Sequence, residues 1–103
     1  MRKSVFALLF LTAGCASPAP QFLGATRHDV TLSGIRFVVF QKGETAEVVR
    51  LGYLVRAERA QVPALMLRAA EMTTGCAVVP GSEVTGLPGD TGEMRLRLRC
   101  PAT

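Results

Sequence analysis

Runs of apolar and polar residues divide the main part of the chain into strands, one helix and a final strand. Residues 35–40 form an apolar run rich in β-branched side chains, and residues 45–55 form a second one. The short segment 42–44 between them has the composition of a turn, because it contains glycine. Two such runs joined by a short turn predict a β-hairpin. A weaker strand is expected before the hairpin, at 29–32.

The composition after the hairpin changes to helix-forming residues, which predicts a helix over 62–74. Pro63 suits the first turn of that helix, although an alternative start near Ala57 would put a kink at the proline. Arg68 and Glu71 are expected on the solvent side. The apolar residues at helical spacing form the predicted buried face: Val62, Leu65, Met66, Ala69 and Met72.

The last segment, 94–100, alternates strictly between apolar and polar residues and is the clearest strand in the chain. Gly75 is a natural helix terminator in the left-handed conformation, just before Cys76. Residues 80–93 are rich in glycine and proline and are expected to form a loop. The sequence therefore predicts an α+β fold with a small antiparallel sheet in ββαβ order and one helix packed on one face. The residues of the last strand expected to face inward are Met94, Leu96, Leu98 and Cys100.

The same alternation places Arg95, Arg97 and Arg99 together on the opposite face, at intervals of about 7 Å along the strand. A row of guanidinium groups can bind an anionic partner such as lipid headgroups, a phosphorylated glycan or an acidic protein surface. The alternative is a solvated sheet face, on which the arginines pair with acids across the strands or protect an edge strand from aggregation.

The start of the chain has the features of a secretory signal. Arg2 and Lys3 precede an apolar stretch at 5–11, and small residues follow it. The stretch is too short to cross a membrane, because a spanning helix needs about 20 apolar residues. We therefore expect export, with any membrane attachment being covalent.

The segment Leu11-Thr12-Ala13-Gly14-Cys15 resembles the lipobox of bacterial lipoproteins. The resemblance implies that Cys15 carries a diacylglyceryl group, that cleavage occurs before it, and that the new amino terminus is acylated. It also implies a signal peptide at 1–14. The small residues and two prolines of 16–21 indicate a flexible tether. We therefore expect a lipidated cysteine with its tether at 15–27 and a small domain at 28–103. No aspartate follows the cysteine, which favours the outer membrane of the cell envelope. The alternative is an ordinary secretory signal that is cleaved nearby.

Three cysteines leave one unpaired in an exported chain, and lipidation of Cys15 would account for it. Cys76 and Cys100 are then expected to form a disulfide, because disulfides persist in such compartments. The alternative is a pair of free thiols or a metal pair, but two cysteines without neighbouring histidines fall short of a zinc site. We expect no metal and no cofactor.

The net charge gives no support for nucleic acid as a partner. The whole chain carries +4, and removal of Arg2 and Lys3 with the signal leaves +2, which is ordinary for a soluble domain. The expected partners are therefore the membrane, through the lipid on Cys15, and an anionic or protein component of the envelope.

Catalysis has little support in the sequence. His28 beside Asp29 could act as an oriented base, but no nucleophile motif accompanies it, and a surface position is expected for this histidine. The favoured hypothesis is a non-enzymatic binding or scaffold module of the envelope. One alternative is a small envelope hydrolase that assembles His28 with an acid and a nucleophile. Another is a structural accessory subunit that docks on a larger complex through exposed Val38 or Phe40.

Overall fold

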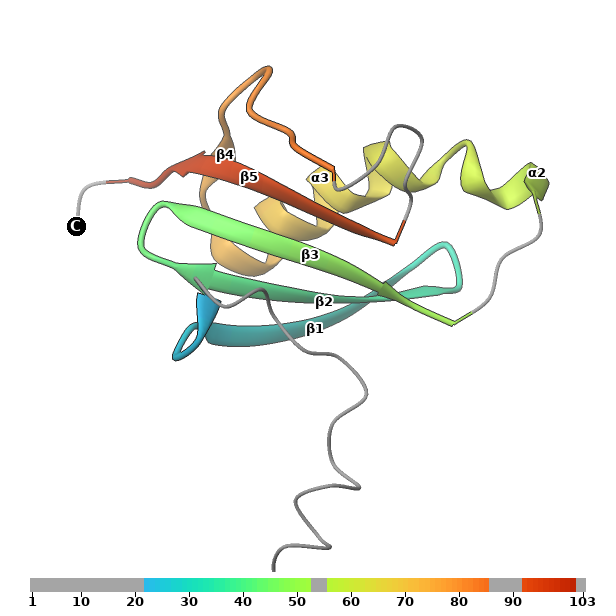
Figure 1. Ribbon diagram of the computed structural model, residues 1–103, viewed down its shortest axis with the longest axis horizontal. Coiled ribbons are helices and arrows are strands. Elements are labelled where there is room, and N and C mark those ends of the chain that lie inside the picture. The colour runs from blue at the N-terminus through green and yellow to red at the C-terminus, as the bar shows by residue number, and fades with distance from the viewer. Residues whose placement is uncertain (1–21, 53–55, 86–91, 102–103) are drawn as a thin grey trace, which may run out of the picture.

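A computed structural model describes residues 22–52, 56–85 and 92–101, and it shows an antiparallel sheet with one long helix on one face (Figure 1). The strands lie in the order β1-β2-β3-β5-β4. The predicted α+β fold is confirmed. Along the chain the elements are β1 (Thr26–Leu32), β2 (Ile35–Lys42), β3 (Thr45–Leu51), α2 (Arg56–Arg59), α3 (Val62–Thr74), β4 (Ala77–Val78) and β5 (Glu93–Arg99).

Strands β1, β2 and β3 form two consecutive hairpins, and the second is the predicted one. The turn between β1 and β2 contains only Ser33 and Gly34, both with positive φ, which is the two-residue type I′ geometry that matches strand twist. Strand β1 begins three residues before the expected position 29. Strand β3 ends at Leu51, and residues 53–55 of the expected strand lie outside the described residues.

Helix α3 has the predicted bounds, with Pro63 in its first turn. The alternative kinked start is not observed, because α2 is a separate single turn ahead of it. Gly75 adopts the left-handed conformation at φ 73°, and its backbone N–H donates to the carbonyl oxygen of Glu71 at 3.0 Å. Both Arg68 and Glu71 are exposed, as expected.

The prediction for the buried side of α3 was wrong at one position. Met72 is 57% exposed, whereas Ala70 is fully buried together with the four other predicted residues. At 100° per residue, Ala70 and Met72 lie about 80° from Val62 on opposite edges of the apolar stripe. The apolar pattern treats the two edges alike, and the sheet packs on the edge where alanine permits close approach.

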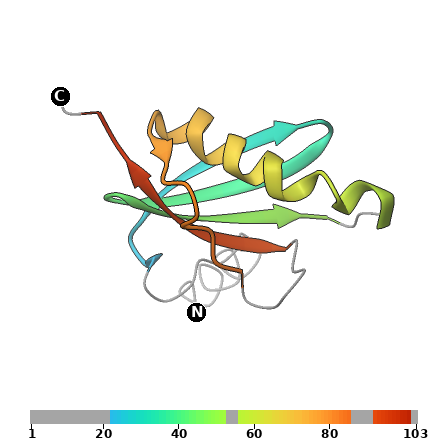
Figure 2. The same cartoon turned by 90° about the horizontal axis from the view of Figure 1, so that it is seen from above.

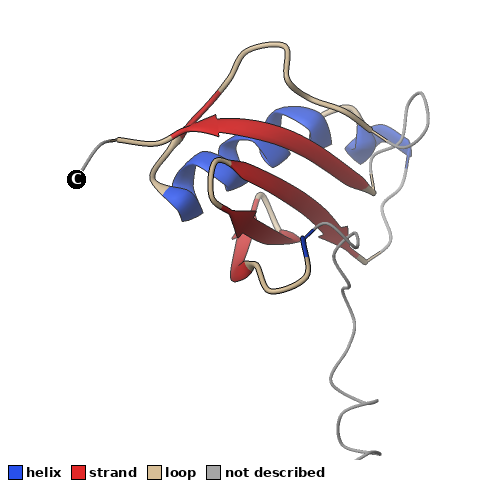
Figure 3. Cartoon of the chain, turned by 60° about the vertical axis from the view of Figure 1, so that its left-hand side comes forward, coloured by secondary structure: helices blue, strands red, loops and turns tan. Residues whose placement is uncertain are grey.

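The two faces of the sheet differ in what covers them, as Figures 2 and 3 show from two further directions. The helix-covered face packs against α3. The other face carries the arginines of β5 and is called the arginine face below; its buried cluster is Phe22, Val38 and Phe40. The buried cluster between the sheet and α3 is called the main core below. It consists of Ile35, Phe37, Val39, Ala46, Val48, Val62, Leu65, Met66, Ala69, Ala70, Cys76, Met94, Leu96 and Leu98.

The arginine-face cluster corrects two expectations. Val38 and Phe40, expected as exposed docking positions, are only 1% and 5% exposed. Phe22 covers them and is itself 4% exposed, so residues 22–27, assigned to the tether from the sequence, take part in the fold. The sequence does not reveal this because an isolated phenylalanine after a proline-containing stretch has no periodic pattern around it.

The predicted disulfide between Cys76 and Cys100 is present, with an Sγ–Sγ distance of 2.06 Å. It joins the segment after α3 to the residue after β5. The Glu44 carboxylate accepts a hydrogen bond from the backbone N–H of Cys100 at 3.1 Å and thereby fixes the same end of the sheet. The expected loop 80–93 contains a short bridge at Val84, whereas its residues 86–91 lie outside the described residues.

Candidate functional site

The arginines of β5 lie on one face, as the alternation predicts. Arg95 is partly buried, and Arg97 and Arg99 are exposed. The intervening residues of the strand, Met94, Leu96 and Leu98, are buried on the helix-covered face. This division holds the three guanidinium groups on the arginine face without any cost to the main core.

Strand β5 is not an edge strand, so the proposed protective role of its arginines is wrong. One side of β5 pairs with β3. On the other side, Val79 N–H donates to the Arg97 carbonyl at 2.9 Å, and Val84 and Arg95 exchange two backbone hydrogen bonds of 2.8 Å. The backbone N–H of Arg97 donates to the Ser82 hydroxyl at 3.1 Å. The backbone of β5 is therefore paired on both sides, and its arginines are not needed to block an exposed edge.

The side chains of Arg95, Arg97 and Arg99 form no ion pair or hydrogen bond with any other residue in the ranges that the structure describes. The ion pair found on this face joins Arg27 Nε to Asp29 Oδ1 at 3.1 Å, within β1. The expected alternative of cross-strand pairing is thus not seen for the β5 arginines. Their donor groups are available to an external acceptor.

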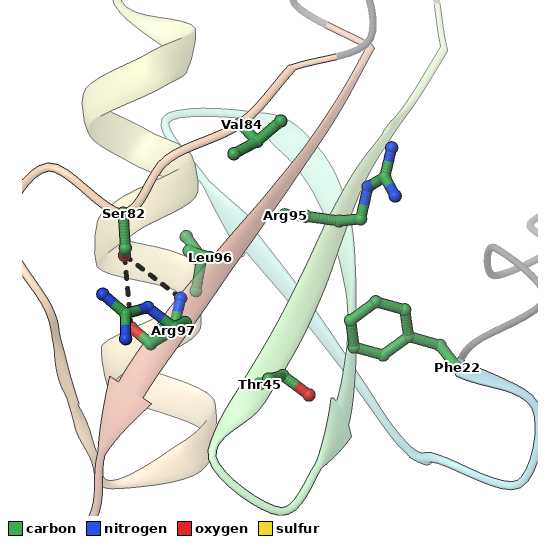
Figure 4. A pocket seen from close by; sticks show the side chains of 7 residues that line it. All are labelled: Phe22, Thr45, Ser82, Val84, Arg95, Leu96 and Arg97. Atoms are coloured by element: carbon green, nitrogen blue, oxygen red, sulfur yellow. Dashed lines mark hydrogen bonds between the residues drawn. The ribbon is translucent and has the colours of Figure 1, made fainter.

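A pocket of about 420 Å³ opens beside two of these arginines (Figure 4). It combines cationic groups, one aromatic ring, two hydroxyl groups and apolar surface. Such a mixture suits a ligand with an anionic group and an apolar part. The residues that line it are Phe22, Thr45, Ser82, Val84, Arg95, Leu96 and Arg97.

The hydroxyl groups of the pocket already donate their hydrogens within the protein. Ser82 Oγ donates to the Val79 carbonyl at 2.7 Å, and Thr45 Oγ1 donates to the Lys42 carbonyl at 2.8 Å. The pocket's donors for an anion are therefore the guanidinium groups of Arg95 and Arg97. Guanidinium groups bind carboxylate and phosphate in a bidentate manner.

Glu47 is an acid on this face that its sequence context does not single out. It is fully buried, and the strand register places it between Phe40 on β2 and Arg95 on β5. The register of the predicted hairpin could have placed Glu47 on the arginine face, but no local pattern around it indicates that it is buried.

The residues considered for catalysis are not assembled into a site. His28 lies on the helix-covered face, half-buried, with Nε2 enclosed and without a hydrogen-bond partner among the described residues. This position corrects the expectation of a surface histidine. Asp29 is on the arginine face, bound to Arg27, so the two neighbours form no acid–base pair. Within residues 22–52, 56–85 and 92–101 there is also no group of three or more metal-ligating side chains.

Cys15, the predicted lipid attachment site, lies outside the described residues. No helix in the described part of the chain is both long enough and apolar enough to cross a membrane. Comparison of the chain with protein-family models, with curated proteins and with solved structures finds no match in any of the three.

Proposed function

We propose that the protein is a lipid-anchored lipoprotein of the bacterial envelope that acts as a non-enzymatic binding module for an anionic partner. The observation that carries the binding role is the pocket that Arg95, Arg97 and Phe22 line together. The anchor is supported by the lipobox-like segment that ends at Cys15.

The partners and positions of the polar groups favour binding over catalysis. The guanidinium groups of β5 have no partner among the described residues, whereas the hydroxyl of Ser82 is already engaged in two strong contacts. The imidazole of His28 and the carboxylate of Asp29 lie on opposite faces of the sheet. A hydrolase would need these groups to converge on one pocket.

Covalent lipid gives the anchor its strength. A single acyl chain holds a protein only marginally on a membrane, and each further chain adds about 0.8 kcal/mol per buried methylene. The three chains implied by the lipoprotein resemblance would keep the domain on one membrane surface. A weak binding site would then act at the high local concentration that anchoring provides.

The anchor is tested by the intact mass of the protein purified from the membrane fraction, with Cys15→Ser as control. We expect a chain that begins at Cys15 and carries the mass of its acyl groups, plus two hydrogens after reduction of the Cys76–Cys100 bridge. A soluble product that carries no acyl mass would refute the anchor.

The binding face is tested by titrating the isotopically labelled protein with inorganic pyrophosphate and recording amide chemical shifts. We expect changes at 82–85 and 94–98, around the pocket, and none along α3. Shifts spread equally over both faces, or no shifts, would contradict a specific anionic site.

A further inference from the structure

We infer that the arginine face lies against the membrane and binds the phosphate headgroups of anionic phospholipids. This inference deepens the proposed function and rests on the lipid anchor at Cys15. Three independent observations support it: the attachment point of the tether, the distribution of charge, and the apolar side chains exposed beside the pocket.

The tether enters the fold on the arginine face. Six residues, 16–21, separate Cys15 from Phe22, and the link spans at most about 25 Å when fully extended. Phe22 packs on Val38 and Phe40 of that face. The following turn is fixed by Ala25 N–H, which donates to the Phe22 carbonyl at 3.0 Å. The first point of the domain after the anchor is therefore on the arginine face.

The opposite orientation would place α3 against the membrane. The tether would then have to pass around an edge of the sheet and across the thickness of the helix layer, which adds roughly 10 Å. The short link from Cys15 to Phe22 therefore keeps the arginine face closer to the lipid surface than the helices. Charge can then select between the two orientations.

The arginine face carries more cations than acids. The cations are Arg27, Arg36, Lys42, Arg95, Arg97 and Arg99, and the acids are Asp29, Glu47 and Glu93. The exposed charges with described side chains on α2 and α3 are balanced, with Arg59 and Arg68 against Glu58 and Glu71. Each cation close to an anionic membrane strengthens binding about fivefold. An anionic bilayer therefore attracts the arginine face more strongly than the described side chains of the helices.

The pocket and its surroundings fit a lipid headgroup. Arg95 and Arg97 supply bidentate donors for a phosphate group. Val84, which lines the pocket, is 57% exposed, and Leu23, next to Phe22, is 66% exposed. Apolar side chains beside cations are the composition of surfaces that enter the membrane interface. Met72 is similarly exposed but lies on α3, away from this arrangement.

The experiment uses the chain 15–103 with Cys15→Ser, which retains every described residue and has no lipid. Binding is measured by flotation with phosphatidylcholine vesicles, with and without phosphatidylglycerol, at low ionic strength. The test variant is Arg97→Gln with Arg99→Gln. The matched control is Arg59→Gln with Arg68→Gln, which removes the same charge from two exposed positions on α2 and α3.

We expect binding to vesicles that contain phosphatidylglycerol and not to phosphatidylcholine alone. The test variant should lose about 25-fold in affinity, about fivefold for each arginine, whereas the control should change little. Arg97→Lys with Arg99→Lys keeps both charges, so it should bind much more tightly than the test variant and fall below the parent only by the bidentate contact of Arg97.

Equal losses in the test and control variants would overturn the inference, as would binding that ignores lipid charge or no binding at all. Binding of free pyrophosphate without any vesicle binding would assign the pocket to a soluble anion instead and would also overturn it. Because this chain carries no lipid, the result is independent of whether Cys15 is modified. Failure of the anchor is detected separately by the intact mass.

Discussion

The two faces of the sheet are made by alternate residues of the same strands, yet they are buried in different ways. On the helix-covered face, α3 closes a continuous core that includes Phe37. On the arginine face, a cluster of three buried residues under Phe22 covers only part of the surface. The comparison indicates that stability resides mainly on one face, whereas the other carries the arginines of β5, whose side chains have no partner among the described residues.

The same division explains why the pocket can form. Arg95 and Arg97 are flanked on β5 by buried residues that point to the other face. The main core therefore fixes the position of the arginine backbone, while the guanidinium groups take no part in packing. Binding residues on a rigid strand are better positioned than residues on a loop.

The largest effect is expected in the helix-covered core. Phe37→Ala should lower the free energy of unfolding by about 4 kcal/mol, because a phenylalanine that is only 1% exposed leaves a cavity that the sheet and α3 cannot close. Urea denaturation followed by circular dichroism measures the loss. A change below about 1 kcal/mol would mean that this face does not hold the fold together.

The disulfide joins the helix layer to the strand that carries the arginines. Replacement of both Cys76 and Cys100 by alanine should cost about 3.5 kcal/mol, from the loss of a loop closed over a sequence separation of 24 residues. The same urea titration, with the reduced parent protein as a second sample, measures the effect. Identical midpoints for oxidised and reduced protein would contradict it.

The arginine-face cluster should contribute less than the main core. Phe22→Ala is expected to cost about 2.5 kcal/mol, because Phe22 is 4% exposed but belongs to a cluster at the surface of the sheet. Leu23→Ala is the neighbouring control, and its 66% exposure predicts a change within about 0.5 kcal/mol. Equal losses in the free energy of unfolding at the two positions would contradict a stabilising role for the burial of Phe22.

The elements with strong periodic patterns could be predicted from the sequence. The alternation of β5 fixed which of its residues face the core, and helix-forming composition with Pro63 and Gly75 gave the bounds of α3. The pairing of Cys76 with Cys100 followed once Cys15 was set aside.

The features that depend on contacts distant in the chain could not be predicted. Phe22 packs on Val38 and Phe40, which are distant from it in the chain, and no local sequence pattern predicts that contact. The pocket needs residues from four separate segments, so it exists only after folding. The backbone pairing of β5 with Val84 could not be predicted either, because a single bridge leaves no periodic pattern in the sequence.

The rotation of α3 about its own axis decides that Ala70 is buried and Met72 exposed, and two substitutions can test it. Ala70→Leu should cost about 2 kcal/mol, because a fully buried alanine has no room for a larger side chain. Met72→Ala should change stability by less than about 0.5 kcal/mol, since Met72 is 57% exposed. Thermal and urea unfolding give both values. A larger loss of stability for Met72→Ala than for Ala70→Leu would mean that Met72 is buried, as expected from the sequence.

The smallest effect on stability is expected where the effect on binding is largest. Arg97→Gln with Arg99→Gln should change the free energy of unfolding by less than about 0.5 kcal/mol, because both side chains are exposed and neither has an ion-pair partner among the described residues. The change can even be stabilising, since it relieves repulsion between like charges on one strand. Urea unfolding and vesicle flotation on the same sample measure the two quantities. A large loss of stability would make the arginines part of the fold, whereas unchanged stability with weakened binding would show that this face is reserved for a partner.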